Sequence, residues 1–248
     1  MEQFITQSDI SKQILKSAKL SSNLPVNTLI IGEDGVGKKI LSKEILPQAT
    51  VFDALEFETL LNRKMITADQ YSSLILYHID KVLNIEEFLE NIKHIKIVAT
   101  SYEKSNRFSN NFAIKIEIPP LSQRKEDCDE LKKIYIQKAS KIFNITTQIN
   151  EKNLEFDLSK NGISLQNSIY KSILRESITT KDLQNLLESF FMDQLEDGKN
   201  YKELLEMFEI PLLKASKKLY RSQVQMANKL EINRITLRKK LETYEGEI

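Results

Sequence analysis

A glycine-rich loop follows a short apolar run near the start of the chain and precedes a helical pattern. Residues 32–39 read Gly-Glu-Asp-Gly-Val-Gly-Lys-Lys, directly after Thr-Leu-Ile-Ile. A loop in this position can wrap its backbone N–H groups around phosphate oxygens at a helix N-terminus, and its lysine adds charge near the β- and γ-phosphates. The order strand, loop, helix indicates a P-loop ancestor. The residues expected to bind nucleotide are Gly32, Gly35, Val36, Gly37, Lys38 and Lys39.

Short β-branched runs alternate with amphipathic stretches over the first half of the chain. The runs cover 28–31, 50–52, 73–77, 95–100 and 114–118. Each is bounded by polar or turn residues, as buried parallel strands tend to be. The stretches between them, such as 40–46 and 85–92, suit crossover helices. This alternation predicts an α/β sheet with helices on both faces.

The pattern becomes helical after Pro119-Pro120. Between residues 122 and 143 the apolar positions fall on one helical stripe, and they are Cys128, Leu131, Ile134, Ala139, Ile142 and Phe143. Helical patterns continue over 163–174 and again from Thr179, where Thr-Thr-Lys-Asp resembles a capping box. We therefore predict an α/β core over 1–120, a helical lid and linker over 121–197, and an all-α domain over 198–248 that follows a polar break at 196–200.

The last fifty residues predict one long helix and a closely spaced helix pair. An apolar stripe over 201–219 keeps its phase on both sides of Pro211, which predicts a kink in one helix. Two shorter helices, 222–230 and 233–244, are separated only by Glu231 and Ile232, as in a helix-turn-helix. Residues 214–240 hold nine basic side chains and one acidic side chain. This local charge predicts a polyanionic partner.

Composition excludes several other classes of protein. The chain has 248 residues, 41% hydrophobic and 29% charged, which is ordinary for a globular protein. The single cysteine, Cys128, cannot form an internal disulfide, and the spacing of His78 and His94 matches no metal-ligand pattern, so no structural metal is expected. No run approaches the roughly 20 apolar residues of a membrane span, and the polar start lacks a signal-peptide core. We expect a cytoplasmic protein without a membrane partner.

The second half of an NTPase site is absent from the expected place. A working site carries an acidic pair at the end of a hydrophobic strand, but the strand over 73–77 ends in Tyr77 and His78. Asp53 and Asp80 could each replace one acid without forming a pair, and the sequence reveals no partner for His78. We therefore assign no catalytic residues and expect no ATP hydrolysis. Two interpretations of the loop stay open: a relic of the fold, or a site for ATP or ADP.

Four segments resemble the NtrC-type bacterial enhancer-binding proteins, AAA+ regulators that end in a Fis-type DNA-binding domain. They are 25–39 around the P-loop, 118–127 between core and lid, Leu165-Gln-Asn167 in the lid, and 201–244 at the C-terminus, where 232–241 is the most specific match. In this family an acidic residue commonly follows the P-loop lysine. The resemblance implies an AAA+ P-loop core, a helical lid and a Fis-like helix-turn-helix domain.

The chain departs from this family at its catalytic positions. Tyr77 and His78 correspond to the Walker B acids, Ile163 to the sensor arginine of the lid, and Arg107 is the one candidate for an arginine finger. No GAFTGA-like sequence, which the family uses to grip sigma-54, lies between the P-loop and the Walker B strand. Glu231 stands where the family's helix-turn-helix commonly has glycine, so we expect a different backbone there.

Helical spacing divides the last helix into an inner and an outer face. Ile232, Leu237 and Leu241 are expected to face the other helices. The outer residues expected to bind DNA are Asn233, Arg234, Thr236, Arg238, Lys239 and Lys240, together with Ser222 as the N-cap of the preceding helix. The resemblance implies that Asn233, Arg234 and Lys239 reach the major groove, and that Thr236 and Arg238 contact mainly phosphates.

Three functions are compatible with these sequence features. The first is a DNA-binding transcriptional regulator, a homodimer on double-stranded DNA, whose inactive AAA+ module serves assembly or nucleotide sensing. The second is an ATP-dependent activator of sigma-54 polymerase. The third is an interaction module that modulates another transcription regulator. The stripe over 201–219 offers a dimer surface, although packing within one chain accounts for part of it.

Overall fold

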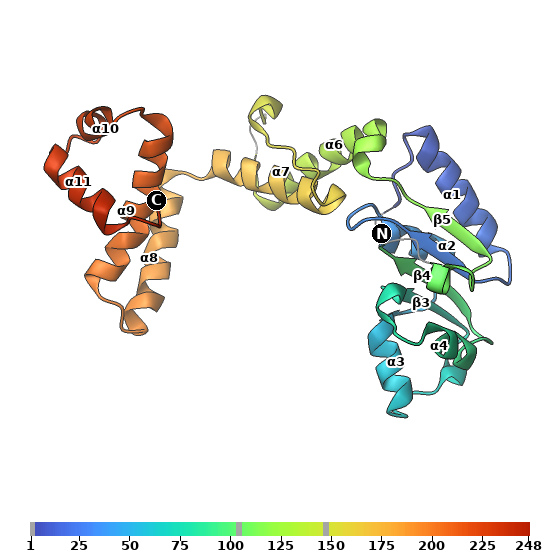
Figure 1. Ribbon diagram of the computed structural model, residues 1–248. Helices are drawn as coiled ribbons and strands as arrows, with labels where there is room; N and C mark the ends of the chain where they lie inside the picture. The colour runs from blue at the N-terminus through green and yellow to red at the C-terminus, as the bar shows by residue number, and fades with distance from the viewer. Residues whose placement is uncertain (1–2, 103–105, 146–148) are drawn as a thin grey trace. The chain divides into compact units, whose positions relative to one another are not determined.

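The computed structural model describes residues 3–102, 106–145 and 149–248. The chain divides into two compact units, Met1–Ser177 and Ile178–Ile248. Figure 1 shows the sheet and its helices in the first unit and a helical second unit. Each unit is described by itself.

A parallel sheet forms the centre of the first unit. Within the described residues it has five strands, in the order β2-β3-β4-β1-β5, and every neighbouring pair is parallel. The strands are β1 (Thr28–Ile31), β2 (Thr50–Asp53), β3 (Ser73–Tyr77), β4 (Lys96–Ser101) and β5 (Ile114–Glu117). The sequence predicted all of these strands to within a residue at each end. Because the strands are parallel, their carboxyl ends meet at one edge of the sheet.

Helices cover both faces of this sheet, as predicted. Alternate residues of β3 belong to different cores: Leu74 and Leu76 to one face, Ile75 to the other. The helices are α1 (Asp9–Ser22), α2 (Lys38–Ile45), α3 (Ala54–Asn62), α4 (Ile85–Asn91) and the short α5 (Asn106–Ser109). Residues of α1 and α2 pack in the core that contains Ile75, whereas residues of α3 and α4 pack in the core that contains Leu74 and Leu76. Single turns of 3-10 helix lie at Ala68–Gln70, Ile79–Lys81, Leu121–Gln123 and Glu151–Asn153.

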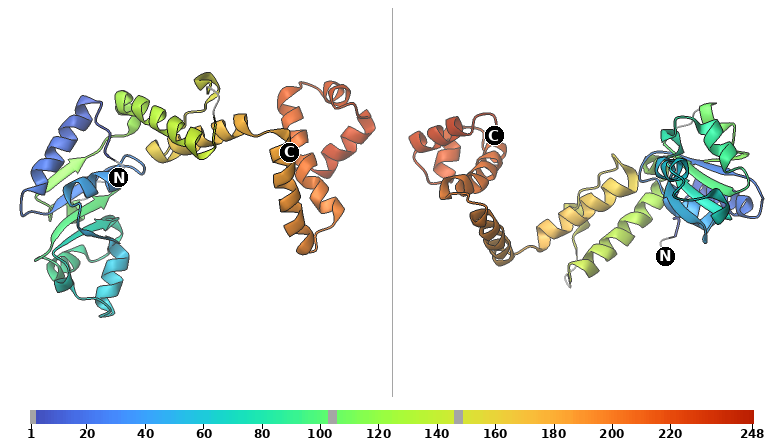
Figure 2. Two further views of the ribbon diagram at one scale, coloured as in Figure 1. Left: turned by 180° about the vertical axis from the view of Figure 1, so that it is seen from behind. Right: turned by 90° about the horizontal axis from the view of Figure 1, so that it is seen from below.

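Two long helices form the lid of the first unit. They are α6 (Lys125–Ile142) and α7 (Asn161–Ser177), which lie side by side (Figure 1 and Figure 2). Their shared core contains Cys128 and Ala139 of the expected stripe, with Leu131 and Phe143 at its margin. Ile142 differs from the expectation because it is 60% exposed. Tyr135 and Ile136 pack at this core as well.

Four helices make up the described second unit: α8 (Thr180–Glu196), α9 (Tyr201–Leu219), α10 (Gln223–Lys229) and α11 (Arg234–Thr243). Thr179 and Asp182 form the expected capping box, and α9 continues through Pro211. Leu213 of α9 packs with Met226, Ala227, Leu237 and Tyr244 in one small core. The break predicted at 196–200 separates α8 from α9 inside this unit, where Phe191 and Phe208 join the two helices through rings 5.7 Å apart. No helix in the described part of the chain has the length and apolarity that a membrane span requires.

Candidate functional site

The predicted phosphate loop joins β1 to α2 in a conformation that depends on glycine. Gly35 and Gly37 adopt φ values of +78° and +108°, in the left-handed region that side chains disfavour. A Cβ on Gly35 would lie 2.2 Å from the carbonyl oxygen of Lys160, and one on Gly37 would lie 2.9 Å from the ring of Phe4. The N-terminal segment and the start of α7 therefore both lie against this loop.

The two lysines at the end of the loop occupy different surroundings. Lys38 is only 8% exposed, and its ammonium donates to the carbonyl oxygens of Gly32 and Glu33. Burial lowers the pKa of Lys38, and the nearby Asp34 carboxylate, 3.9 Å away, opposes that shift. Lys39 is exposed, and its ammonium lies 4.9 Å from the centre of the Tyr77 ring. The loop thus carries one buried and one exposed cation, and both lysines line the same cavity.

The lid is hydrogen-bonded to the loop. The backbone N–H of Gly162 donates to the carbonyl oxygen of Gly35 at 3.1 Å. The Asn161 amide donates to the Glu33 carboxylate and to the carbonyl oxygen of Asp34, both at 3.0 Å, and its oxygen accepts from the N–H of Leu121. These bonds fix the start of α7 beside the phosphate loop.

One cavity lies between the loop and the lid, and a second adjoins it between the N-terminal segment, α2 and α6. The first, of about 300 Å³, is lined by residues of the loop, the strand ends and the lid: Asp34, Gly35, Gly37, Lys38, Lys39, Ile40, His78, Thr100, Tyr135, Gly162, Ile163 and Gln166. The second, of about 310 Å³, is lined mainly by apolar side chains and shares Ile40 and Tyr135 with the first. A cationic cavity that adjoins an apolar one suits the phosphates and the base of a nucleotide, and the volumes match those of ligand pockets.

The carboxyl end of β3 carries a histidine that is held by a carboxylate. The Nδ1 atom of His78 lies 2.7 Å from the Asp53 carboxylate, and the backbone N–H of His78 donates to the Thr100 hydroxyl at 3.2 Å. Partial burial opposes ionisation of Asp53, but hydrogen bonds from His78 and from the Leu55 N–H hold its pKa below the ordinary value. His78, to which sequence analysis assigned no partner, therefore has one.

This pairing could have been found from the strand order. Asp53 ends β2 and lies opposite Tyr77 in the register of β2 with β3. Carboxyl ends of neighbouring parallel strands bring such side chains together. Asp80, the other substitute considered, accepts from the N–H of Tyr102 at 3.4 Å. Within the described residues, no three His, Cys, Asp or Glu side chains form a group that could hold a metal.

The resemblance assigned the sensor arginine of the lid to the position of Ile163, which is apolar. Ile163 lines the first cavity and is half exposed there. The side chain of Arg107, the candidate arginine finger, lies outside the described part of the structure. The described cations of the first cavity are therefore Lys38 and Lys39, with the imidazole of His78 beside them.

The helix pair at the C-terminus is built on side-chain caps and one strained residue. Ser222 caps α10 by accepting from the Gln225 N–H at 3.2 Å, and Asn233 caps α11 by accepting from the Ile235 N–H at 2.8 Å. Glu231, in the turn between them, has φ of +52°. This is the left-handed conformation that glycine adopts without strain. The turn therefore has the backbone geometry typical of glycine, and the Cβ of Glu231 makes that conformation strained.

The two faces of α11 are divided almost as predicted. Leu237 is 1% exposed, and Ile232 and Leu241 pack beside it in the core. The outer residues that are exposed are Asn233, Arg234, Thr236, Arg238 and Lys239. Arg238 is paired with Glu242 at 2.8 Å across one helical turn.

Lys240, which we expected among the exposed DNA-binding residues of α11, is not fully exposed. It is half-buried, and its ammonium is paired with Glu209 of α9. The hydrogen bond from Lys240 holds the pKa of Glu209 below its ordinary value, and the Tyr244 hydroxyl also donates to this carboxylate at 2.9 Å. The side of α11 that carries residue 240 faces α9, so Lys240 joins the two helices within the unit.

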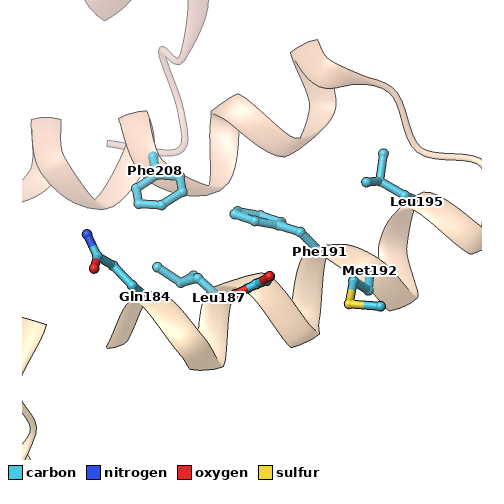
Figure 3. A pocket seen from close by; sticks show the side chains of 7 residues that line it. Gln184, Leu187, Phe191, Met192, Leu195 and Phe208 are labelled. Atoms are coloured by element: carbon cyan, nitrogen blue, oxygen red, sulfur yellow. The ribbon is translucent and has the colours of Figure 1, made fainter. Parts of the chain in front are cut away.

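An apolar surface lies along α8 and α9. No residue of α8, all of which is described, is buried, although the helix carries several large apolar side chains. A hollow of about 440 Å³ on this surface is lined by Gln184, Leu187, Glu188, Phe191, Met192, Leu195 and Phe208. Figure 3 shows Phe191 and Phe208 projecting from the two helices toward each other, with Leu195 further along α8.

Neither a model of a known protein family nor a curated protein sequence matches the chain. Solved structures do match in fold. NtrX from Brucella abortus in complex with ATP has a TM-score of 0.62 at 14% identity, over 99% of this chain and 70% of that chain. The same protein in complex with ADP has a TM-score of 0.61 at 16% identity, over 98% and 70%. The likeness agrees with the sheet order and the loop geometry: the chain has an AAA+ P-loop α/β fold.

Proposed function

We propose that the chain is a DNA-binding transcriptional regulator that contacts duplex DNA through α10 and α11, a helix-turn-helix of the Fis type. The observation that carries this proposal is the exposed outer face of α11. Arg234 and Arg238 lie one turn apart on it, with Asn233, Thr236 and Lys239 beside them. A helix with this face suits the major groove, where arginine makes bidentate contacts to guanine. Ser222 caps α10, and in this proposal it contacts a phosphate at the N-terminal end of that helix.

The proposal includes a homodimer. One helix pair covers a small stretch of DNA, and useful affinity requires two half-sites. The apolar surface of α8 and α9 supports this assembly, because Leu195 and Met192 are 57% and 60% exposed at its hollow. Contiguous exposed apolar side chains mark interaction sites in soluble proteins. We assign the surface to a second copy of this chain.

In this proposal the AAA+ module binds ATP or ADP and serves assembly or nucleotide sensing. The cationic cavity and the adjoining apolar cavity support nucleotide binding, as do the complexes of NtrX with ATP and with ADP. Tyr77, His78 and Ile163 replace the groups that catalysis requires, so no hydrolysis is assigned. Activation of sigma-54 polymerase is set aside because no GAFTGA-like sequence is present. The protein would act in the cytoplasm, with access to DNA.

The dimer gives the first test. Leu195→Glu places a charge in the proposed interface, and burying an unpaired charge costs about 3 kcal/mol or more, so we expect the dimer dissociation constant to rise about 100-fold. Ser189→Glu adds the same charge to an exposed residue of α8 that does not line the hollow. This variant should change the dimer dissociation constant little. Sedimentation equilibrium measures both constants.

The same pair of variants tests the link to DNA. Binding to a duplex of about three helical turns and random sequence, followed by fluorescence anisotropy, should weaken in Leu195→Glu and stay unchanged in Ser189→Glu. A wild-type protein that stays monomeric, and binds the duplex as well as Leu195→Glu does, would contradict the dimer. It would instead favour a different regulator as the occupant of the α8–α9 surface.

A further inference from the structure

Sites with a P-loop ordinarily bind magnesium through two positions. One is the hydroxyl of the residue that follows the loop lysine, and the other is an acid at the end of a neighbouring strand. In this chain these positions are Lys39 and Tyr77. Neither side chain is a magnesium ligand, because Mg²⁺ prefers carboxylates, water and phosphate oxygens.

Lys39 and Tyr77, which occupy the two positions that ordinarily bind magnesium, contact each other instead. The Lys39 ammonium lies 4.9 Å from the centre of the Tyr77 ring, within the range of a cation–π contact. Tyr77 is the last residue of β3 and lies opposite Asp53 in the register of β2 with β3. The aromatic face therefore contacts the ammonium of a residue, Lys39, that lines the first cavity.

Three carboxylates near the loop, those of Asp34, Asp53 and Asp80, each already have an ion-pair or hydrogen-bond partner. The Asp53 carboxylate is engaged by His78 at 2.7 Å and by the Leu55 N–H. Asp34 lines the cavity, but it lies 3.9 Å from the Lys38 ammonium. A magnesium ion here would face two ammonium groups, and like charges at such short range repel strongly in a partly buried site.

We infer that this chain binds the nucleotide without magnesium, with the Lys39 ammonium in place of the metal ion. The inference rests on the proposed nucleotide binding and names its ligand class as the metal-free nucleoside triphosphate or diphosphate anion. Lys38 and Lys39 neutralise the phosphate oxygens together, and a lysine is well suited to this because its ammonium is a compact point charge on a flexible stem. The affinity for the nucleotide then gains nothing from a divalent ion.

Calorimetric titration of the full chain with ATP, once in EDTA and once in excess Mg²⁺, tests this inference. We expect the affinity in EDTA to equal or exceed that in Mg²⁺, because the metal removes negative charge from the phosphates that the lysines contact. Lys39→Ser removes the ammonium and restores a hydroxyl. It should bind ATP about tenfold more weakly in EDTA and should gain affinity when Mg²⁺ is added.

Lys43→Ala is the matched control, because Lys43 is an exposed lysine of α2 that does not line the cavity. It should leave both affinities unchanged. Lys39 is exposed, so its substitution should not unfold the unit, and thermal unfolding of each variant checks this. Binding by the wild type that requires Mg²⁺ would overturn the inference and leave nucleotide binding in place. Absence of ATP binding in both solutions would overturn nucleotide binding as well, without bearing on the DNA-binding helix.

Discussion

Alanine at both Arg234 and Arg238 is expected to lower the affinity for duplex DNA by two to three orders of magnitude at fixed salt. Both arginines are exposed on the outer face of α11, one helical turn apart. Each arginine contact to a base or phosphate contributes about 1–3 kcal/mol. The ion pair of Arg238 with Glu242 offers little competition, since both side chains are exposed and such pairs contribute little.

The salt dependence of the DNA affinity distinguishes specific arginine contacts from general attraction between charges. Each lost phosphate contact should reduce the slope of log affinity against log salt by about one. Lys199→Ala with Lys202→Ala removes the same net charge from two exposed positions, one just before α9 and one in its first turn, and is the control. Anisotropy titrations at several salt concentrations measure affinity and slope. Equal affinity of the wild type and the arginine double variant would refute α11 as the contact surface.

Asp127→Ala is expected to destabilise the first unit by about 3–5 kcal/mol, a large part of the stability of an ordinary domain. The Asp127 carboxylate is fully buried and accepts from the N–H groups of Gln7 and Ser8 and from the hydroxyls of Ser8 and Ser11, at 2.5–2.8 Å. The Arg124 guanidinium lies 3.5 Å from it and is 2% exposed. Removing the carboxylate leaves this cation buried without its counter-charge.

This destabilisation should extend to the phosphate loop. Arg124 also donates to the carbonyl oxygen of Val36 in the loop, to that of Pro119 and to the Ser11 hydroxyl. Urea unfolding, followed by circular dichroism, measures the free energy of unfolding. Asp129→Ala, two residues along α6, removes an exposed carboxylate paired with Lys132 and should cost less than about 1 kcal/mol. An equal loss of unfolding free energy in the two variants would show that the buried contacts of Asp127 add no stability.

The stability contributed by Asp127 should depend on pH. Burial opposes ionisation, but hydrogen bonds from Ser11, Ser8 and Gln7 hold the pKa of Asp127 below its ordinary value. The stability is therefore present above the pKa of the unfolded chain, about 4, and is lost as the pH falls through the lower pKa of the folded state. Asp127→Ala should lose this acid-induced decrease, whereas Asp129→Ala should retain it.

Elements that depend only on residues close together in the chain could be predicted from the sequence. Each strand was found because it is a short β-branched run between polar residues, and the caps at Thr179 and Ser222 were found because they lie next to helical patterns. The phosphate loop was recognisable because strand, glycines and lysine are consecutive. At Glu231 a different backbone was expected, but the residue has φ of +52°, the left-handed conformation that glycine adopts.

The rest depends on contacts between distant segments. His78 and Asp53 meet only because β2 and β3 are neighbours, and periodicity does not reveal strand order. Lys240 was grouped with the outer residues of α11, but the packing of α9 places Glu209 beside it. Ile142 was expected on the buried stripe of α6 but is 60% exposed, whereas the next residue, Phe143, packs on Tyr170 of α7. In each case a tertiary neighbour, or its absence, decides where the side chain lies.

Selection of binding sites from a randomised pool of duplex DNA by the purified full chain tests the central claim most directly. A dimer that inserts α11 into two major grooves predicts enriched sequences with two-fold symmetry, with half-site centres about one helical turn, roughly 10 base pairs, apart. The same selection with the Arg234→Ala, Arg238→Ala variant should not enrich them. Recovery of sequences no different from the starting pool, or equal enrichment by that variant, would contradict the account.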